Sequence, residues 1–209
     1  MRTIVFATGN TGKMREIREI LKGMEAEILS MKEIGIDADI EENGTTFEEN
    51  ALIKVKAVAR ILENHTDEKL RSAIVLADDS GLEIDYLNKE PGIYSARYMG
   101  EDTPYSVKNK NLIERLVGVP DEKRTARFVC AIAAALPGDE AFAVRGVIEG
   151  RIGYQEKGDN GFGYDPIFYV PEYGCTTAQL SEEEKNRVSH RGKALKAMEK
   201  ELEKRISFI

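Results

Sequence analysis

The sequence is poor in the residues that build cysteine and histidine sites: it holds two of each. Cys130 and Cys175 lie far apart and outside any C-x-x-C spacing, so neither a disulfide nor a structural zinc site is indicated. We expect both to be small buried side chains. The two histidines, His65 and His190, are too few for a metal centre built on imidazole ligands.

Long apolar runs and an excess of basic charge are also missing. No stretch approaches the ~20 apolar residues that a membrane-spanning helix needs, and the N-terminus lacks the pattern of a secretory signal. We therefore expect a cytoplasmic protein. The net charge of -7 argues against a general nucleic-acid binder, because such binding needs a broad Lys and Arg surface. With 42% hydrophobic residues, the 209-residue chain is globular, with room for one large domain or two lobes.

What the sequence does contain is a turn suited to phosphate, directly after an apolar strand expected at residues 3–7. Its members supply backbone N–H groups, side-chain donors and one cation, and they are Thr8, Gly9, Asn10, Thr11, Gly12 and Lys13. A P-loop would have glycine at Ala7 and Ser or Thr at Met14, so any metal must be held elsewhere. An ordinary strand-to-helix turn accounts for the same residue types.

Hydrophobic spacing predicts alternating strands and helices along the chain. We expect a helix after Lys13, a strand at residues 26–30, a helix from a Thr45–Glu48 capping box to about residue 63, and a buried strand at residues 73–77. Later we expect a helix from residue 103 to about 118, a hairpin of residues 126–136 and 141–148, a capping box at Ser181 and Glu184, and a closing helix. This order predicts an α/β protein with a mixed sheet.

Acidic residues occur where a metal site in such a sheet would need them. Asp78 and Asp79 follow the buried strand, and Ser80 and Gly81 come next. Because neighbouring strand residues face opposite ways, only one of the two carboxylates should enter a given site unless the strand kinks, which Gly81 makes feasible. The pair Glu41-Glu42 could supply a second carboxylate, and such oxygen ligands suit Mg²⁺. Taken alone, each of these segments also fits a solvated turn or a surface run.

Two later segments carry features of a base-binding site. Residues 158–166 form an irregular glycine-rich loop in which Phe162 could stack on a purine while Asp165 meets the base edge. Near the start of the last helix, three potential cations could contact phosphate oxygens or base carbonyls: Lys185, His190 and Arg191. Charges at such a position are more often a solvated helix face.

Taken together, six ordered motifs resemble those of the inosine/xanthosine triphosphate pyrophosphatases nearly from end to end. They are Thr8-Gly9-Asn10 with Lys13, Thr46-Phe47-Glu48-Glu49-Asn50-Ala51 with Lys54, Ala77-Asp78-Asp79-Ser80-Gly81-Leu82, Pro91-Gly92-Ile93-Tyr94-Ser95-Ala96-Arg97-Tyr98, Gly161-Phe162-Gly163-Tyr164-Asp165-Pro166 and Ser189-His190-Arg191-Gly192.

The resemblance implies a homodimer of an elongated two-lobed α/β fold with a mixed sheet and an active cleft between the lobes. It further implies that the chain, as a single domain over residues 1–209, converts ITP, dITP and XTP to the monophosphate and pyrophosphate with Mg²⁺. By motif matching, Asp79 would be catalytic, and Glu41 and Asp79 would hold the metal. The substrate would be bound by Thr8, Gly9, Asn10, Thr11, Gly12, Lys13, Lys54, Ser80, Phe162, Gly163, Tyr164, Asp165, Lys185, His190 and Arg191. Arg97 is a further phosphate candidate.

Two other functions are compatible with much of this pattern. One is a related pyrophosphatase of the septum-formation inhibitor type, which takes modified or pyrimidine nucleotides. The other is a nucleotide sensor without catalysis, which would keep the phosphate-binding turn and the stacking loop. A sensor would not need paired carboxylates, so Glu41 and Asp79 weigh against it.

Overall fold

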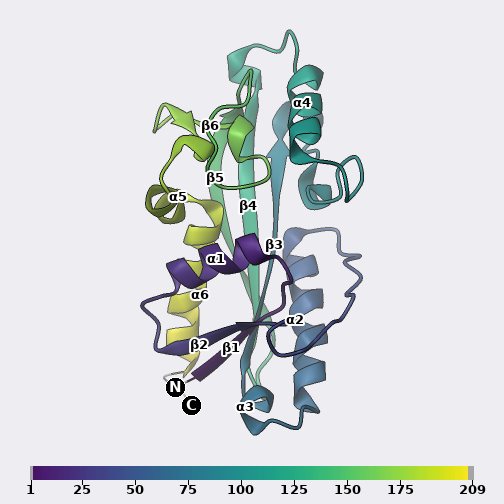
Figure 1. The fold of residues 1–209 in the computed structure, drawn as a ribbon, viewed down its shortest axis with the longest axis vertical. Coiled ribbons are helices and arrows are strands. Elements are labelled where there is room, and N and C mark those ends of the chain that lie inside the picture. Colours follow the sequence, from purple (N-terminus) through teal and green to yellow (C-terminus); the bar gives the residue numbers. More distant parts are fainter. Residues whose placement is uncertain (1, 207–209) are drawn as a thin grey trace. The chain divides into compact units, whose positions relative to one another are not determined.

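The computed structural model describes residues 2–206 (Figure 1). Its strands are β1 (Arg2–Phe6), β2 (Ala26–Ser30), β3 (Ile74–Ile84), β4 (Thr125–Ala135), β5 (Phe142–Ile152), β6 (Phe168–Val170) and β7 (Cys175–Thr176). They are hydrogen-bonded in the order β2-β1-β3-β4-β5-β6-β7. β1 pairs in parallel with β2 and β3, whereas β6 is antiparallel to β5 and β7, so the predicted mixed sheet is confirmed.

The helices are α1 (Thr11–Ile20), α2 (Phe47–Glu63), α3 (Glu68–Arg71), α4 (Tyr105–Arg115), α5 (Glu182–Val188) and α6 (His190–Ile206). Within residues 2–206, none of them combines the length and apolarity that a membrane crossing requires. Both cysteines are free thiols; Cys130 is buried as expected, but Cys175 is partly exposed.

The described residues fall into two compact units. Unit 1 comprises residues 2–79, 130–146 and 194–206, and unit 2 comprises residues 80–129 and 147–193. The long strands β3, β4 and β5 contribute residues to both units. The expected single domain, and a cleft between its lobes, stay predictions.

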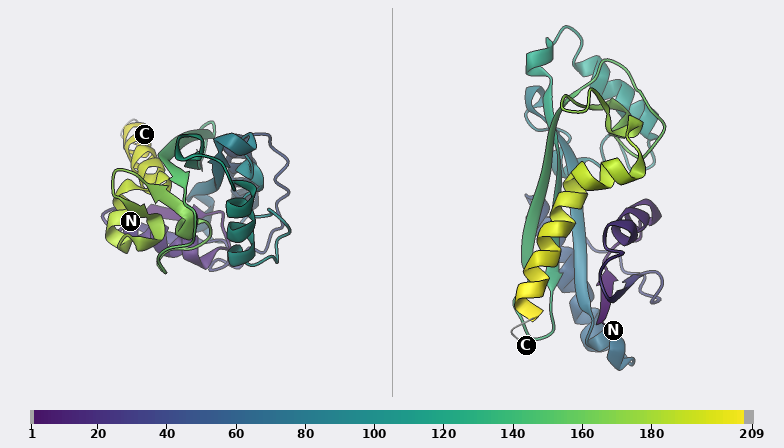
Figure 2. Two further views of the ribbon diagram at one scale, coloured as in Figure 1. Left: turned by 90° about the horizontal axis from the view of Figure 1, so that it is seen from above. Right: turned by 90° about the vertical axis from the view of Figure 1, so that its left-hand side faces the viewer.

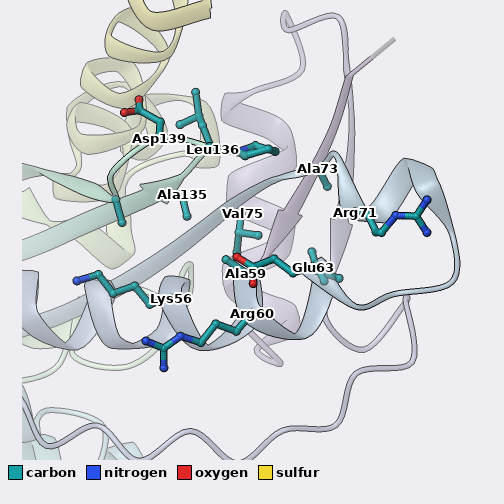
Figure 3. Close-up of a pocket in the computed structure, with 14 residues that line it drawn as sticks. Lys56, Ala59, Arg60, Glu63, Arg71, Ala73, Val75, Ala135, Leu136 and Asp139 are labelled. Carbon is teal, nitrogen blue, oxygen red and sulfur yellow. The ribbon is translucent and has the colours of Figure 1, made fainter.

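In unit 1, helices cover both faces of the sheet. Phe6 and Leu76 belong to a core cluster that includes α1 and α6, and Figure 2 shows α6 in yellow running along the strands. Val75, which points to the other face, lies with α2 side chains around the hollow drawn in Figure 3. The apolar side chains that helix α2 buries are Phe47, Ala51, Val55, Val58 and Leu62.

Unit 2 has its own core beneath α4. Leu112 of this helix and Leu116, which caps its C-terminus, pack with Leu82 of β3, Phe128 of β4 and Phe168 of β6. These side chains are all almost fully buried. Unit 2 therefore has the apolar interior needed to support the irregular loop at residues 158–166.

Helix α2 begins one residue later than its expected capping box. Thr46 is the N-cap, and its side chain accepts a hydrogen bond from the Glu49 backbone N–H at 3.1 Å. The predicted Thr45–Glu48 box is therefore wrong. Both threonines are followed by glutamate three residues later, so the sequence rule alone fits either start. The second box, Ser181 with Glu184, is confirmed at the start of α5.

Strand β3 is longer than the expected segment at residues 73–77. It continues through Asp78, Asp79, Ser80 and Gly81 to Ile84, so the strand end predicted at Asp78 is wrong. These polar residues remain in extended backbone because β3 continues in the sheet beside β4, beyond Leu76, where its pairing with β1 ends. Their side chains therefore keep the alternation of a strand.

Candidate functional site

The phosphate-binding turn of the sequence is the N-terminus of α1. Helix α1 begins at Thr11, inside the predicted turn and not after Lys13. Asn10 is the N-cap, and its Oδ1 accepts from the Lys13 backbone N–H at 3.0 Å. The first N–H groups of an α-helix have no acceptor within the helix, and the helix dipole favours an anion there. This end of α1 is therefore suited to bind a phosphate group.

The two glycines of this turn do not adopt unusual backbone angles. Neither Gly9 nor Gly12 has a positive φ, so the expected convergence of N–H groups comes from the helix end and not from a special turn. A Cβ added at Gly9 would have no atom within 4 Å, so the space in front of this residue is open. A ligand can approach the backbone there.

The two adjacent aspartates of β3 have different partners. Asp78 Oδ2 lies 3.0 Å from Lys13 Nζ. Asp79 Oδ2 accepts a hydrogen bond from Asn50 Nδ2 at 3.1 Å, and its Oδ1 lies 3.8 Å from Lys54 Nζ. Asp78 thus pairs with α1 and Asp79 with α2, as the alternation of a strand predicts.

Asp79 lies in a setting that alters its acidity. Only 8% of the residue is exposed, and this burial raises the pKa of its carboxyl above the ordinary value. The charge of Lys54 and the hydrogen bond from Asn50 oppose this shift, while the negative charge of Glu42 adds to it. A buried carboxylate with a raised pKa is a better proton acceptor near neutral pH than an exposed one.

The structure brings Glu42, not Glu41, close to these side chains. Glu42 Oε2 lies 3.0 Å from Lys54 Nζ, whereas Glu41 is exposed. The metal role expected for Glu41 stays a prediction. In the described part of the chain, no cluster of three or more His, Cys, Asp or Glu side chains is arranged to hold a metal.

In unit 2, residues 158–166 form the irregular loop that the sequence predicts. Gly158, Gly161 and Gly163 all have positive φ, between +69° and +84°, which explains the choice of glycine. Phe162 lies between two of them and is 37% exposed. The loop also lines a hollow of about 380 Å³ that includes Phe162, a size usual for small-molecule sites.

Asp165 organises this loop. Its Oδ2 accepts from the Phe162 backbone N–H at 2.8 Å and from Lys185 Nζ at 2.7 Å, and Thr177 Oγ1 donates to its Oδ1 at 2.8 Å. A Cβ at Gly161 would lie 2.3 Å from Oδ2. These contacts direct the carboxylate inward, and the predicted contact of Asp165 with a base edge stays a prediction.

Tyr164 is likewise turned into unit 2. Its side chain is buried, its hydroxyl donates to the Ser95 carbonyl at 2.6 Å, and its ring meets the Tyr105 ring edge-on at 5.2 Å. Among Phe162, Tyr164 and Asp165, Phe162 is the residue whose side chain is exposed and accessible to a ligand.

The three predicted cations lie at the junction of α5 and α6. Lys185 Nζ and Arg191 Cζ lie 5.0 Å and 5.6 Å from the centre of the Phe162 ring. Arg191 Nη2 also donates to Ser80 Oγ at 3.3 Å, and the His190 ring stacks on Phe128 at 4.9 Å. Phe162, the cations and Ser80 are thus brought together within unit 2.

Comparison with known proteins identifies the family. A model of the Ham1 family matches residues 4–201. The chain belongs to the Ham1 family.

Several relatives match this chain over nearly its whole length. The chain is 47% identical over 206 residues to the dITP/XTP pyrophosphatase of Caldanaerobacter subterraneus, covering 99% of this chain and 98% of the relative. It is 45% identical over 203 residues to that of Bacillus subtilis, covering 97% and 98%. The structure of the Staphylococcus aureus Ham1 protein is 41% identical, with a TM-score of 0.84 over 98% of this chain and 100% of that one. The resemblance and the fold class that it implied are thereby confirmed.

Three buried polar residues near the Ham1 motifs escaped the sequence analysis as site residues. Asn50 contacts Asp79, Thr177 contacts Asp165, and Asn109 Nδ2 donates to Glu156 Oε1 at 2.7 Å and to the Gly163 carbonyl at 3.2 Å. One signal was available for Asn50: it shares the helical spacing of the apolar face of α2, where a polar side chain is unusual. Thr177 and Asn109 had no such local signal.

A further hollow in unit 1 contains none of the predicted site residues. It measures about 440 Å³ and lies between α2, β3 and the turn that joins β4 to β5 (Figure 3). Its floor is apolar, with Ala59, Val75 and Ala135, while Lys56 and Arg60 extend from α2 at its edge. This hollow is larger than the one of about 380 Å³ beside Phe162, so volume alone does not locate the candidate site of this Ham1 protein.

Proposed function

We propose that this Ham1 protein hydrolyses the non-standard purine nucleotides ITP, dITP and XTP to the monophosphate and pyrophosphate. The observation that carries the proposal is the buried Asp79 carboxylate beside Lys54, in the unit that also holds the anion-binding end of α1. Two relatives that match nearly the whole chain, at 45–47% identity, bear the name dITP/XTP pyrophosphatase, which supports the same conclusion.

In this proposal unit 1 binds the triphosphate. The first-turn N–H groups of α1 donate hydrogen bonds to phosphate oxygens, with Thr8 to Lys13 around them, and Lys13 and Lys54 supply positive charge. Lys13 and Lys54 are already held by Asp78 and Glu42, at 3.0 Å in each case, so their positions are set before the ligand arrives. Such preorganised charge favours the transition state of phosphoryl transfer.

We propose Mg²⁺ as the metal, bound by Asp79 and by a carboxylate of the Glu41-Glu42 pair. The donor set fits, because Mg²⁺ is usually held by one or two protein carboxylates together with substrate phosphates and water. Glu42 and Asp79 both lie beside Lys54 Nζ, at 3.0 Å and 3.8 Å, which supports a paired carboxylate arrangement. When bound, the ion neutralises charge on the phosphate oxygens.

Asp79 is the proposed general base. Its carboxylate orients a water molecule and takes its proton as the water oxygen bonds to the α-phosphorus, and pyrophosphate leaves with the bond electrons. The raised pKa of Asp79 suits this role, since a base is most effective when its pKa approaches the working pH.

Unit 2 is proposed to bind the purine base. Phe162 stacks on the ring, and Lys185, His190 and Arg191 offer donors to a 6-oxo group. Adenine presents a 6-amino group instead, which would leave buried donors unpaired; this gives strong discrimination. Ser80, Gly163, Tyr164 and Asp165 shape this site in the proposal.

A substrate panel tests the function. The protein is incubated with ITP, dITP, XTP, GTP and ATP, and with UTP, CTP and 5-methyl-UTP, each with and without Mg²⁺, while pyrophosphate is resolved from orthophosphate. We expect pyrophosphate from the first three only, and only with Mg²⁺. Orthophosphate as the sole primary product would refute attack at the α-phosphorus. Preference for modified or pyrimidine nucleotides would favour the septum-formation inhibitor type, and binding without turnover would favour a sensor.

The assembly follows from the same resemblance. We propose a cytoplasmic homodimer in which each chain is one two-lobed domain. Light scattering coupled to size-exclusion chromatography measures the mass directly. A mass near the 23.4 kDa of one chain would refute the dimer.

A further inference from the structure

Asn50 is a fully buried polar side chain in the first turn of α2. Burying a side-chain amide costs free energy unless its donor and acceptor find partners. Its neighbours on this face of the helix, Phe47 and Ala51, are apolar.

Both ends of the Asn50 amide are used. Its Oδ1 accepts from the Gly44 backbone N–H at 2.9 Å, and its Nδ2 donates to Asp79 Oδ2 at 3.1 Å. The orientation follows from chemistry, because a backbone N–H requires an acceptor and an ionised carboxylate requires a donor. The amide therefore links the segment that carries Glu41 and Glu42 to the carboxylate of Asp79.

The contact at Gly44 depends on the absence of a side chain. A Cβ there would lie 2.7 Å from Asn50 Oδ1 and 2.7 Å from Glu49 Cβ, both too close. Next to it, the Thr45 backbone N–H and hydroxyl donate to Glu49 Oε2 at 2.6 Å and 2.8 Å. Glycine at position 44 thus lets the acidic segment approach α2. There the side chains of Asn50 and Glu49 accept hydrogen bonds from the successive residues Gly44 and Thr45.

We propose that Asn50 is a positioning residue, which fixes the plane of the Asp79 carboxylate and holds the acidic segment beside it. The proposal rests on the proposed function, since it assumes that these carboxylates bind a metal. Mg²⁺ demands nearly ideal geometry, so carboxylates held in advance by a shared amide lose less free energy when they bind. Hydrogen-bond partners of metal ligands typically contribute about 10- to 100-fold in metal affinity or activity.

Two variants test the link from opposite sides. Asn50→Asp keeps the size and the acceptor for Gly44 but turns an oxygen toward Asp79. Gly44→Ala leaves the buried amide intact and pushes the acidic segment away. Asn64→Asp, which adds the same charge at the other end of α2, and Gly23→Ala, where a Cβ meets no atom within 4 Å, are the matched controls.

The measurement is Mn²⁺ binding by isothermal titration calorimetry, with and without pyrophosphate, together with the metal concentration that gives half-maximal activity. We expect both test variants to weaken Mn²⁺ binding by about 10- to 100-fold while circular dichroism stays unchanged. The controls should bind like the wild type.

Wild-type Mn²⁺ binding in both test variants would overturn the positioning role, provided that Asp79→Asn weakens it. If Asp79→Asn also binds Mn²⁺ normally, the metal assignment of the proposed function fails, and the positioning role fails with it.

Discussion

The Phe162 ring offers the most direct test of base binding. It is 37% exposed on a loop of unit 2, and its backbone is fixed by a hydrogen bond from its N–H to Asp165 at 2.8 Å. Lys185 and Arg191 lie beside the ring. Phe162→Ala removes the ring, Phe162→Leu keeps much of its volume without an aromatic face, and Phe162→Tyr keeps the face.

The size of the effect follows from stacking. Loss of one base–aromatic stack costs about 1–3 kcal/mol, which corresponds to about 5- to 150-fold in binding. Because the ring is over a third exposed and belongs to a loop, its removal should change the melting temperature little. The contacts of the Phe162 ring with Lys185 and Arg191 are present in the protein without ligand. Losing them therefore changes the stability of the free protein more than it changes the free energy of binding.

The assay separates base from phosphate. Inhibition constants are measured for inosine monophosphate, which carries the base, and for pyrophosphate, which does not. Phe162→Ala and Phe162→Leu should weaken inhibition by the monophosphate and raise KM for ITP, with pyrophosphate inhibition unchanged. Phe162→Tyr should resemble the wild type, as should Tyr86→Ala, which removes a ring that is 52% exposed elsewhere in unit 2.

Wild-type monophosphate inhibition in Phe162→Leu would refute stacking, since only the aromatic face is lost. An equal weakening of pyrophosphate inhibition would show that the substitution disturbs more than base binding.

Four further predictions concern three charged side chains. Asp79→Asn should lower kcat about 10²- to 10⁴-fold while nucleotide still binds in calorimetry; near-normal turnover would refute the role of general base. The pKa of Asp79 is higher in the folded protein than in the unfolded chain. Ionisation of Asp79 therefore opposes folding at any pH above the ordinary carboxyl pKa. Without metal, Asp79→Asn should melt at a higher temperature than the wild type at neutral pH and at the same temperature in strong acid. The hydrogen bond from Arg127 holds the pKa of Asp85 well below its usual range, so Asp85→Asn should melt lower at neutral pH; a gap that stays constant as acid is added would contradict this. Arg124→Leu removes the guanidinium that donates to the carbonyls of Leu116, Ile152 and Gly153. It should lower the free energy of unfolding by about 1–3 kcal/mol for each buried acceptor left without a donor. An unfolding curve in urea that matches the wild type would exclude the effect.

Local patterns predicted those elements whose signals lie within one turn or one strand. The bounds of β2 and the end of α2 agree with expectation, as does the capping box of α5, because spacing and capping depend on near neighbours. The start of α2 was missed by one residue because Thr45 and Thr46 meet the same rule. The strand end expected at Asp78 was wrong because β3 continues beside β4 after its pairing with β1 ends at Leu76.

The sequence by itself determined the family and the residue types of the candidate site, since these depend on motifs that are contiguous in the chain. Only the tertiary structure decided which partners they meet. It joined Asn50 to Asp79, Asp78 to Lys13 and Asp165 to Lys185, and it turned Tyr164 inward. These pairs are far apart in sequence, and their distances are set by how helices pack on the sheet, which no local spacing encodes.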